Sequence, residues 1–343
     1  WGAIRLVSVK KNSPSLPLNF ESASSVLVIR PDRLGDVVLS TPVYESIKSS
    51  FPHLQVTVVV RSNNVPILTD NPNIDKIISF DPKNIGTTIK QLRQNRFDIA
   101  FTLNKKFSAI SSLLALISKA KHKISYAHDE TVWLYDIRLP IDNQQRHESL
   151  NNLELINHSG LKTSSRYPRL YFNQAEEKKI TTMLNTVRKF PQHPLVLIKP
   201  GTRIEKWGWK AENFQIVAEK LSGSKKVEVL FICAPGEELL IDQINQRASQ
   251  KIKKLPILSV KELALVIKKS NLLFCNHTGI MHLASAVETP VVVIFKHGEI
   301  ARWKPINTPH ILLEERKRDA VSPEVVLEKI NQLLTNTPIH KTI

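Results

Sequence analysis

Near its end the chain reads Asn276-His277-Thr278-Gly279-Ile280-Met281-His282-Leu283-Ala284-Ser285, and this stretch decides how the fold is organised. An apolar run, residues 272–274, precedes it, and a second apolar run, residues 291–295, follows it after Pro290. Strand, polar turn, helix and strand in this order form the repeating unit of a parallel α/β sheet. The turn then lies at the carboxyl end of a strand, where such sheets bind ligands.

Two small residues at the start of the predicted helix, Thr278 and Gly279, indicate an anion site. They leave backbone N–H groups available, and the helix dipole adds partial positive charge at the same place. A phosphate suits this position. The alternative is an ordinary capped helix in which His282 is a satisfied core residue.

The same alternation extends backwards through the second half of the chain. Apolar runs that predict strands lie at residues 195–198 and 227–233, and helices are expected at 175–189, 211–221, 261–269 and 325–334. Ser322 and Pro323 are typical of the N-cap and first turn of the last helix.

In the first half, four consecutive β-formers, Val26-Leu27-Val28-Ile29, predict a strand buried on both faces. Further strands are expected at 55–60, 76–80 and 99–103, and helices at 37–49 (with Pro42 near its start), 86–95 and 108–118. We therefore predict an α/β protein with two Rossmann-like domains that face each other across a cleft. The predicted boundaries are a poorly ordered lead (1–24), an N-terminal domain (25–168) that ends in a polar linker (162–168), and a C-terminal domain (169–343).

The amino-acid composition limits the classes of molecule that the protein is expected to bind. The 343 residues carry 48 Lys and Arg against 31 Asp and Glu, a net charge of +17, which favours anionic partners. The basic residues are dispersed, so a dedicated nucleic-acid module is not indicated. Cys233 and Cys275 lie in apolar runs and are expected to be buried thiols. No apolar stretch approaches the roughly 18 residues needed to span a bilayer.

Asp36 is the candidate catalytic group. Gly35-Asp36 follows the first predicted strand at the start of the first helix, so the carboxylate is well placed to accept a proton from a substrate hydroxyl. The alternative is that Asp36 only stabilises the helix N-terminus by its charge.

A second candidate site is the loop Lys199-Pro200-Gly201-Thr202-Arg203-Ile204-Glu205-Lys206-Trp207-Gly208-Trp209, which follows the first strand of the second half. Its hydroxyl, backbone and cationic donors suit a diphosphate. It lacks the spacing of a Walker loop, and it could instead be a surface loop whose tryptophans pack on the next helix. Glu237, after the following strand, could accept hydrogen bonds from a ribose or could be a solvated acid. No residue cluster has the spacing of a metal site, so no metal is expected.

Together these motifs resemble glycosyltransferase family 9, the bacterial heptosyltransferases. The resemblance rests on residues 26–42 (VLVIRPDRLGDVVLSTP), Phe51-Pro52, the loop 201–214, the loop 234–237 and the stretch 276–284, which is close to an Asp-Thr-Gly followed by His-Leu-Ala. It runs from about residue 26 to 335 in consistent order.

The resemblance implies a GT-B fold and an inverting, metal-independent transfer of heptose from ADP-heptose to the inner core of lipopolysaccharide, with the nucleotide-sugar as a substrate and no cofactor. It implies Asp36 as general base. Donor contacts are assigned to Thr202, Arg203, Lys206, Glu237, His277, Thr278, Gly279 and His282, and the acceptor side to Arg33, Gly35 and Lys105. The acceptor would be a phosphorylated glycolipid, and the enzyme would lie on the anionic cytoplasmic face of the inner membrane.

Two departures from the family pattern concern the donor. His277 stands where the family has Asp, and the spacing from Lys206 to Trp209 is one residue longer than the usual Lys-x-Trp. The alternatives are therefore a family member with another nucleotide-sugar or acceptor, a homologue that binds nucleotide or glycan without turnover, and a nucleic-acid binder suggested by charge alone.

Overall fold

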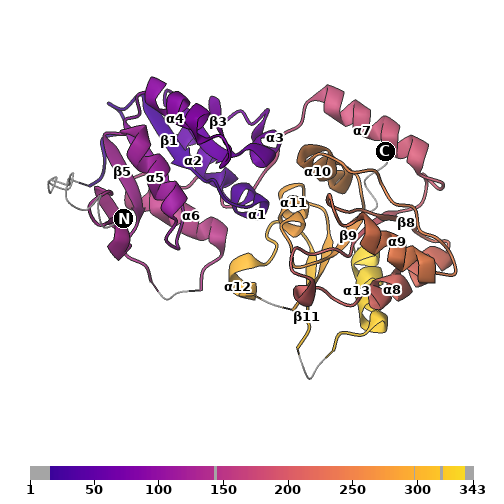
Figure 1. Ribbon diagram of the computed structural model, residues 1–343. Coiled ribbons are helices and arrows are strands. Elements are labelled where there is room, and N and C mark those ends of the chain that lie inside the picture. Colours follow the sequence, from indigo (N-terminus) through magenta and orange to yellow (C-terminus); the bar gives the residue numbers. More distant parts are fainter. Residues whose placement is uncertain (1–15, 143–144, 297, 317–319, 337–343) are drawn as a thin grey trace. The chain divides into compact units, whose positions relative to one another are not determined.

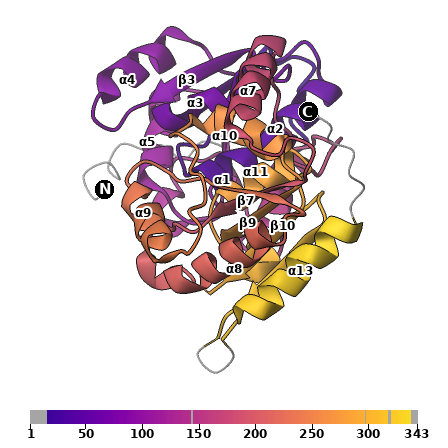
Figure 2. The ribbon, with the colours of Figure 1, turned by 90° about the vertical axis from the view of Figure 1, so that its right-hand side faces the viewer.

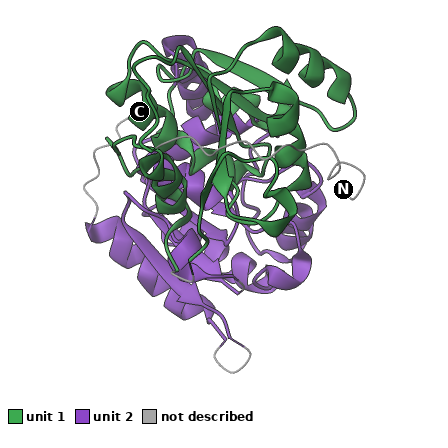
Figure 3. Ribbon diagram, turned by 90° about the vertical axis from the view of Figure 1, so that its left-hand side faces the viewer, with its two compact units in different colours: residues 1–171 green, residues 172–343 purple. Residues whose placement is uncertain are grey.

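The computed structural model describes residues 16–142, 145–296, 298–316 and 320–336, and the chain divides into two compact units (Figures 1 and 3). Unit 1 comprises residues 1–171 and unit 2 residues 172–343. Each unit contains one wholly parallel sheet with helices between its strands. The prediction of two parallel-sheet α/β domains is confirmed.

The unit 1 sheet has six strands in the order β3-β2-β1-β4-β5-β6. They are β1 (Ser25–Ile29), β2 (Gln55–Arg61), β3 (Lys76–Phe80), β4 (Ile99–Thr102), β5 (His122–Tyr126) and β6 (Ile137–Leu139). This is the doubly wound dinucleotide-binding order. The winding reverses between β1 and β4, which are neighbours, so a ligand is expected at the carboxyl ends of these two strands.

Helices cover both faces of the unit 1 sheet. Leu27 and Ile29 point to the face covered by α4 (Ile85–Gln94) and α5 (Ala109–Ser118), where they share a core with Leu92 and Leu114. The other face carries α2 (Thr41–Ser50) and α6 (Glu148–His158), which contact each other. The remaining short helices of unit 1 are η2 (Ser62–Asn64), α3 (Val65–Leu68) and η3 (Asp129–Thr131).

The single helix predicted over residues 37–49 is wrong, because the structure has two helices there. A five-residue helix, α1 (Leu34–Val38), ends before α2 begins at Thr41. The Ser40 hydroxyl donates to the Val37 carbonyl at 2.7 Å and the Thr41 hydroxyl to the Val38 carbonyl at 2.9 Å. Side-chain hydroxyls thus bond backbone carbonyls at the break, and Pro42 lies in the first turn of the second helix, where proline is tolerated.

The segment before β1 packs on unit 1 where the structure describes it. Phe20 is buried, and its ring stacks on Phe51 with centroids 5.3 Å apart. Leu18 N–H donates to the Ser159 carbonyl at 3.0 Å. Residues 16–24 therefore belong to the packed body, whereas residues 1–15 of the predicted lead lie outside the described residues.

The unit 2 sheet has five strands in the order β11-β10-β9-β7-β8. They are β7 (Leu195–Lys199), β8 (Glu228–Phe231), β9 (Leu272–Asn276), β10 (Val291–Phe295) and β11 (His310–Glu314). Counted from β7, this is the flavodoxin-like order 2-1-3-4-5. Its switch point lies between β7 and β9, at the loops that begin with Lys199 and Asn276.

One face of the unit 2 sheet is covered by α8 (Ala211–Gly223), α9 (Glu238–Arg247) and α13 (Pro323–Asn336), with α8 and α13 side by side (Figure 2). The core under them includes Phe214, Phe231 and Phe274. The other helices are α7 (Gln174–Val187), η4 (Glu205–Trp207), α10 (Val260–Lys268), α11 (Ile280–Ala286) and α12 (Ile300–Trp303).

Two predictions concern the chain as a whole: the state of its two cysteines and the lack of a membrane-spanning segment. Cys233 and Cys275 are both buried free thiols, as predicted. Within the described residues, no helix has the length and apolar character needed to cross a membrane.

Candidate active site

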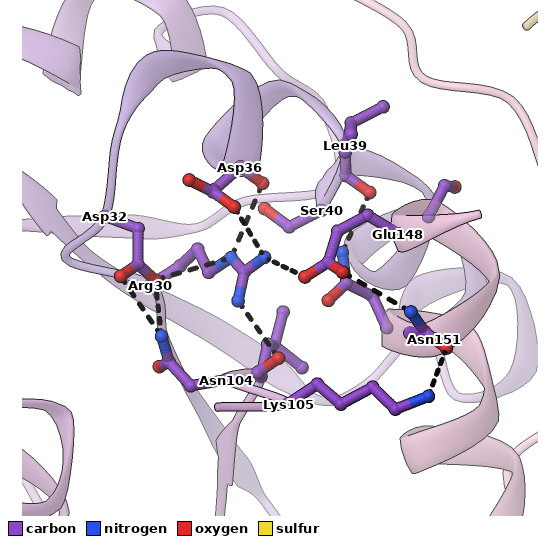
Figure 4. A network of polar contacts seen from close by, with 12 residues as sticks. Arg30, Asp32, Asp36, Leu39, Ser40, Asn104, Lys105, Glu148 and Asn151 are labelled. Carbon is purple, nitrogen blue, oxygen red and sulfur yellow. Dashed lines mark hydrogen bonds and ion pairs between the residues drawn. The ribbon is translucent and has the colours of Figure 1, made fainter. Parts of the chain in front are cut away.

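The switch point of unit 1 is occupied by a buried arginine surrounded by carboxylates (Figure 4). Arg30 follows the last residue of β1 directly and is 1% exposed. Its backbone N–H continues the ladder to the Val59 carbonyl at 2.9 Å, so the strand geometry fixes where the side chain starts. A guanidinium buried at the carboxyl end of a central strand requires compensating acceptors.

Three carboxylates supply that compensation. Arg30 Nη2 lies 2.9 Å from Glu148 Oε1 and 3.3 Å from Asp36 Oδ1, and Arg30 Nε lies 3.5 Å from Asp32 Oδ2. Arg30 Nη1 donates to the Leu103 carbonyl, after β4, at 3.0 Å. The guanidinium therefore ties together β1, α1, the end of β4 and the start of α6.

Asp36 has the properties of a general base. It lies in the first turn of α1, and its side chain is 22% exposed, so one side of the carboxylate is accessible. Burial raises the pKa of the Asp36 carboxyl above its ordinary value, Arg30 opposes that shift, and the nearby Asp32 and Glu148 carboxylates add to it. A carboxylate held in this way takes up a proton more readily than a solvated aspartate does.

The three residues assigned to the acceptor side differ in their exposure and in their contacts. Arg33, at the N-cap of α1, is exposed, and Gly35 is buried in the helix. Lys105 follows β4, and its Nζ lies 3.1 Å from Asp142 Oδ1 and 3.4 Å from Asn151 Oδ1 (Figure 4). It therefore reaches the Arg30 cluster through Asn151, which donates to Glu148. Of the three, Arg33 presents a cation at the surface beside Asp36.

Unit 2 repeats the arrangement of a buried cation after its first strand. Lys199, the last residue of β7, is 3% exposed, and its Nζ lies 2.7 Å from Glu237 Oε1 and 2.6 Å from the Gly201 carbonyl. Glu237 Oε2 accepts from the Ala234 N–H at 2.9 Å. A Cβ at Gly201 would lie 2.2 Å from Glu237 Cδ, so glycine is required for this pairing.

Asn276 joins the two loops at the unit 2 switch point. Its side chain is fully buried at the end of β9, its Oδ1 accepts from the Trp209 N–H at 3.0 Å, and its Nδ2 donates to the Pro200 carbonyl at 2.6 Å. The Trp209 indole donates in turn to the Val321 carbonyl at 3.0 Å. The loop between β7 and α8 is thus fastened at both ends by one amide.

Asn276→Ala is expected to lower the free energy of unfolding by about 2 kcal/mol, because it strands a buried N–H and a buried carbonyl. It should also weaken nucleotide binding, since Pro200 and Trp209 line a pocket of unit 2. Denaturant unfolding and calorimetry with ADP measure the two effects. Asn245→Ala is the control, because Asn245 bridges Ile252 with a similar pair of bonds in α9 and should alter stability alone. Equal nucleotide affinity in both variants would contradict the prediction.

Two cavities flank the loop between β7 and α8. One of about 450 Å³ is lined by Thr202, Gly208, Lys210 and Lys296 among others, and one of about 730 Å³ by Lys206, Trp207, Phe295 and Lys296 among others. The predicted ligands Thr202 and Lys206 therefore face different cavities that share Lys296 as a wall. Arg203 lies between them on the loop and is exposed.

The stretch 276–285 follows β9 as expected. His277 stacks on Phe295 with ring centroids 4.2 Å apart. Thr278 Oγ1 is shielded from solvent and has no hydrogen-bond partner within the described residues. Gly279 is the N-cap of α11, and His282 is 3% exposed, with its ring 6.2 Å from that of Trp303. His282 is therefore part of the core of unit 2, whereas His277 lies beside a residue that lines the larger cavity.

Sequence reasoning missed Arg30, Glu148 and Asn276 as parts of the site, and it treated Lys199 only as one residue of a loop. The sequence did carry a signal for Arg30 and Lys199. Each directly follows four apolar residues of a predicted strand, so each had to be buried at the carboxyl end of that strand. Nothing in the sequence marks Glu148 as the partner of Arg30. Among the residues that the structure describes, no group of three or more His, Cys, Asp or Glu could hold a metal ion.

Comparison with known proteins decides the family. The sequence model of glycosyltransferase family 9 (heptosyltransferase) matches residues 85–332. The chain belongs to glycosyltransferase family 9. The predicted resemblance is confirmed, and with it the prediction of a glycosyltransferase.

Two of the proteins to which the chain is similar are named as lipopolysaccharide heptosyltransferases. The chain is 25% identical to lipopolysaccharide heptosyltransferase 3 of Escherichia coli K12 over 293 residues, which cover 79% of this chain and 82% of that protein. It is 24% identical to the lipopolysaccharide core heptosyltransferase OpsX of Haemophilus influenzae over 304 residues, with 85% and 84% covered. The family 9 glycosyl transferase structure from Veillonella parvula superposes with a TM-score of 0.83 at 19% identity, covering 94% of this chain and 99% of that one. The GT-B fold is confirmed.

Proposed function

We propose that this family 9 enzyme transfers a heptose from ADP-heptose to a phosphorylated inner-core acceptor of lipopolysaccharide, with inversion at the anomeric carbon. The observation that carries the proposal is the position of Asp36, a partly accessible carboxylate with a raised pKa at the switch point of unit 1. The two relatives named above, both lipopolysaccharide heptosyltransferases, support the sugar and the acceptor class.

In the proposed reaction, Asp36 removes the proton from the acceptor hydroxyl as its oxygen attacks the anomeric carbon. The bond from that carbon to the diphosphate oxygen breaks, and ADP leaves with the negative charge. Lys206 and the polar groups of the loop after β7 stabilise that charge on the leaving diphosphate. Glu237, held by Lys199, would contact the nucleoside, and Thr278 and Gly279 the donor.

The acceptor side is proposed to work at an anionic membrane face. The chain carries a net charge of +17, and a membrane-bound, phosphorylated acceptor would be attracted by it. Arg33, exposed beside Asp36, is the residue we assign to that attraction near the base. Peripheral attachment at the cytoplasmic face of the inner membrane follows from the acceptor and belongs to the same proposal.

The proposal is tested by measuring which nucleotide-sugar raises the melting temperature and which is then transferred. A ligand at 100 times its dissociation constant adds about 2.7 kcal/mol of stability, which a thermal scan detects. ADP-heptose should stabilise the protein more than UDP- or GDP-sugars do, and it should be consumed when inner-core acceptor is added. Stabilisation by ADP-heptose without turnover would support a binding protein instead.

A different donor sugar is the second candidate, and His277 is the observation that favours it. A carboxylate there could accept hydrogen bonds from sugar hydroxyls, whereas a neutral imidazole offers one donor and one acceptor. The ring stacks on Phe295, and Gly298 leaves room for it, since a Cβ there would lie 2.9 Å from His277 Cε1.

His277→Asp is expected to shift the ranking of donors, or at least the pH profile, because an imidazole titrates near neutrality and a carboxylate does not. Steady-state rates over a panel of nucleotide-sugars measure the change. His277→Asn, neutral and similar in size to Asp, separates charge from shape. Identical rankings and profiles in all three proteins would mean that position 277 does not face the donor.

A further inference from the structure

The closest partner of Arg30 is Glu148, a residue outside the helix α1 that carries Asp36. The Arg30 Nη2 to Glu148 Oε1 distance is 2.9 Å, against 3.3 Å from the same nitrogen to Asp36 Oδ1. Glu148 is 2% exposed and is the first residue of α6, 118 positions along the chain from Arg30. Its other oxygen accepts from Asn151 Nδ2 at 3.3 Å, one turn further along the helix. Glu148 is thereby fixed at both oxygens.

The position of the guanidinium follows from these contacts. Glu148 and the Leu103 carbonyl, at 2.9 Å and 3.0 Å, hold the two terminal nitrogens. Nη2, the nitrogen that contacts the Asp36 carboxylate, is shared with Glu148, and of the atoms of Asp36, Nε reaches only the backbone carbonyl, at 3.5 Å. Asp36 therefore has a longer contact and keeps part of its carboxylate uncommitted (Figure 4). An arginine that had Asp36 as its main partner would instead bind this carboxylate tightly and reduce its tendency to take a proton.

The charges that face Asp36 come from several elements. They are Arg30 after β1, Asp32 and Arg33 in the loop before α1, and Glu148 on α6. Lys105, after β4, is directed to Asp142 and Asn151, and the Tyr44 hydroxyl on α2 lies 2.7 Å from Ser40 Oγ. Glu148 is thus the buried negative charge that a distant helix adds to the site of the base.

We propose that Glu148 is a positioning residue of the transfer reaction: through Arg30 it fixes the Asp36 carboxylate, and its negative charge assists proton uptake by Asp36. This rests on the proposed function, in which Asp36 accepts the proton of the acceptor hydroxyl. Glu148 itself touches neither substrate. Glu148 binds the Arg30 guanidinium more closely than Asp36 does. The positive charge of Arg30 is therefore balanced mainly by Glu148, and the Asp36 carboxylate remains able to accept a proton.

The test is Glu148→Gln, which keeps the size and the acceptor oxygen but removes the charge. Activity needs ionised Asp36, so kcat falls on the acidic side of the profile. Without the charge of Glu148, Arg30 stabilises the ionised form of Asp36 more strongly. The acidic limb of the profile should therefore move to lower pH by about one unit. The plateau kcat should fall roughly threefold to tenfold, because the base is weaker, with the KM for the donor unchanged.

Glu228→Gln is the matched control. Glu228 also forms a buried ion pair, in unit 2, with Arg188 Nε at 2.9 Å from Glu228 Oε2. The control should lose stability without any change in the pH profile. Glu148→Asp keeps the charge on a shorter arm, so its acidic limb should stay in place while kcat falls. If Glu148→Gln does not fold, the proposal is tested with Glu148→Asp alone. A wild-type kcat in Glu148→Asp overturns the proposal.

A measurement that needs no turnover separates this inference from the proposed function. Carbon-13 NMR titration follows the Asp36 carboxyl directly, with the signal assigned by its loss in Asp36→Asn. The Asp36 pKa should be lower in Glu148→Gln than in wild type, even if no donor is transferred. A folded Glu148→Gln with an unchanged Asp36 titration and an unchanged pH profile overturns the inference. An inactive wild type that shows the expected NMR shift overturns the proposed function alone.

Discussion

Asp36→Asn is expected to lower kcat by roughly 10²–10⁴-fold, the range that general-base catalysis contributes. Asparagine keeps the shape of the side chain and can still contact Arg30, but it cannot accept the proton of the acceptor hydroxyl. Steady-state kinetics with saturating donor and acceptor measure the loss. Affinity for ADP, which we assign to unit 2, should remain at the wild-type value.

Stability provides the control for Asp36→Asn. Burial raises the pKa of Asp36 in the folded protein above its value of about 3.9 in the unfolded chain, so ionisation of Asp36 costs folding free energy as pH rises through the folded pKa. Asparagine avoids that cost. The melting temperature of the variant relative to that of the wild type should therefore rise as the pH rises through the folded pKa of Asp36. Turnover within about threefold of wild type would remove Asp36 from the role of base.

Lys206→Ala is expected to weaken ADP binding roughly 10- to 100-fold, the effect of losing one charge-assisted bond to a diphosphate. Lys206 is exposed on the loop after β7 and lines the larger of the two cavities. Isothermal calorimetry with ADP and with AMP makes the test specific, because AMP lacks the second phosphate and should bind both proteins similarly.

Lys220→Ala serves as the control for Lys206, since Lys220 is an exposed lysine on α8 that pairs with Glu324, with Nζ 3.0 Å from Glu324 Oε1. It should bind ADP as the wild type does. If Lys206→Ala also binds ADP normally, then Arg203 or Lys210 holds the diphosphate, and the alignment of this loop with the family pattern is shifted.

The central strands could be predicted because burial on both faces leaves a signature in the sequence. Val26 to Ile29, Leu195 to Ile198 and Val291 to Phe295 are continuous apolar runs, and each lies inside a strand of the structure. Three elements at or near sheet edges lack that signature. β6 has three residues with Arg138 exposed among them, β5 begins with His122 and Lys123, and β11 is only half-buried, so none stands out from its surroundings.

The arrangement of the site is harder to predict from sequence, because it depends on which distant residues meet. Asp36 and Lys206 could be proposed, since each follows a predicted strand within a recognisable motif. Glu148 could not: its helix, α6, is rich in polar side chains, several of them buried, and so carries a weak apolar period. The pairing of Glu148 with Arg30 exists only once β1 and α6 are packed together.

The shortness of α1 affects how firmly Asp36 is kept in place. Isolated helices below about 12–15 residues are marginal in water, and α1 has five residues, so its order comes from tertiary contacts. These are the burial of Val37 and Val38, the contact of Arg30 with Asp36, and the hydroxyl bonds at Ser40 and Thr41. Such a segment can open locally while the sheet below stays closed. Amide hydrogen exchange at residues 34–38 would then detect local opening around Asp36 that a melting temperature does not show. As the temperature rises, the catalytic rate would fall before the protein unfolds globally.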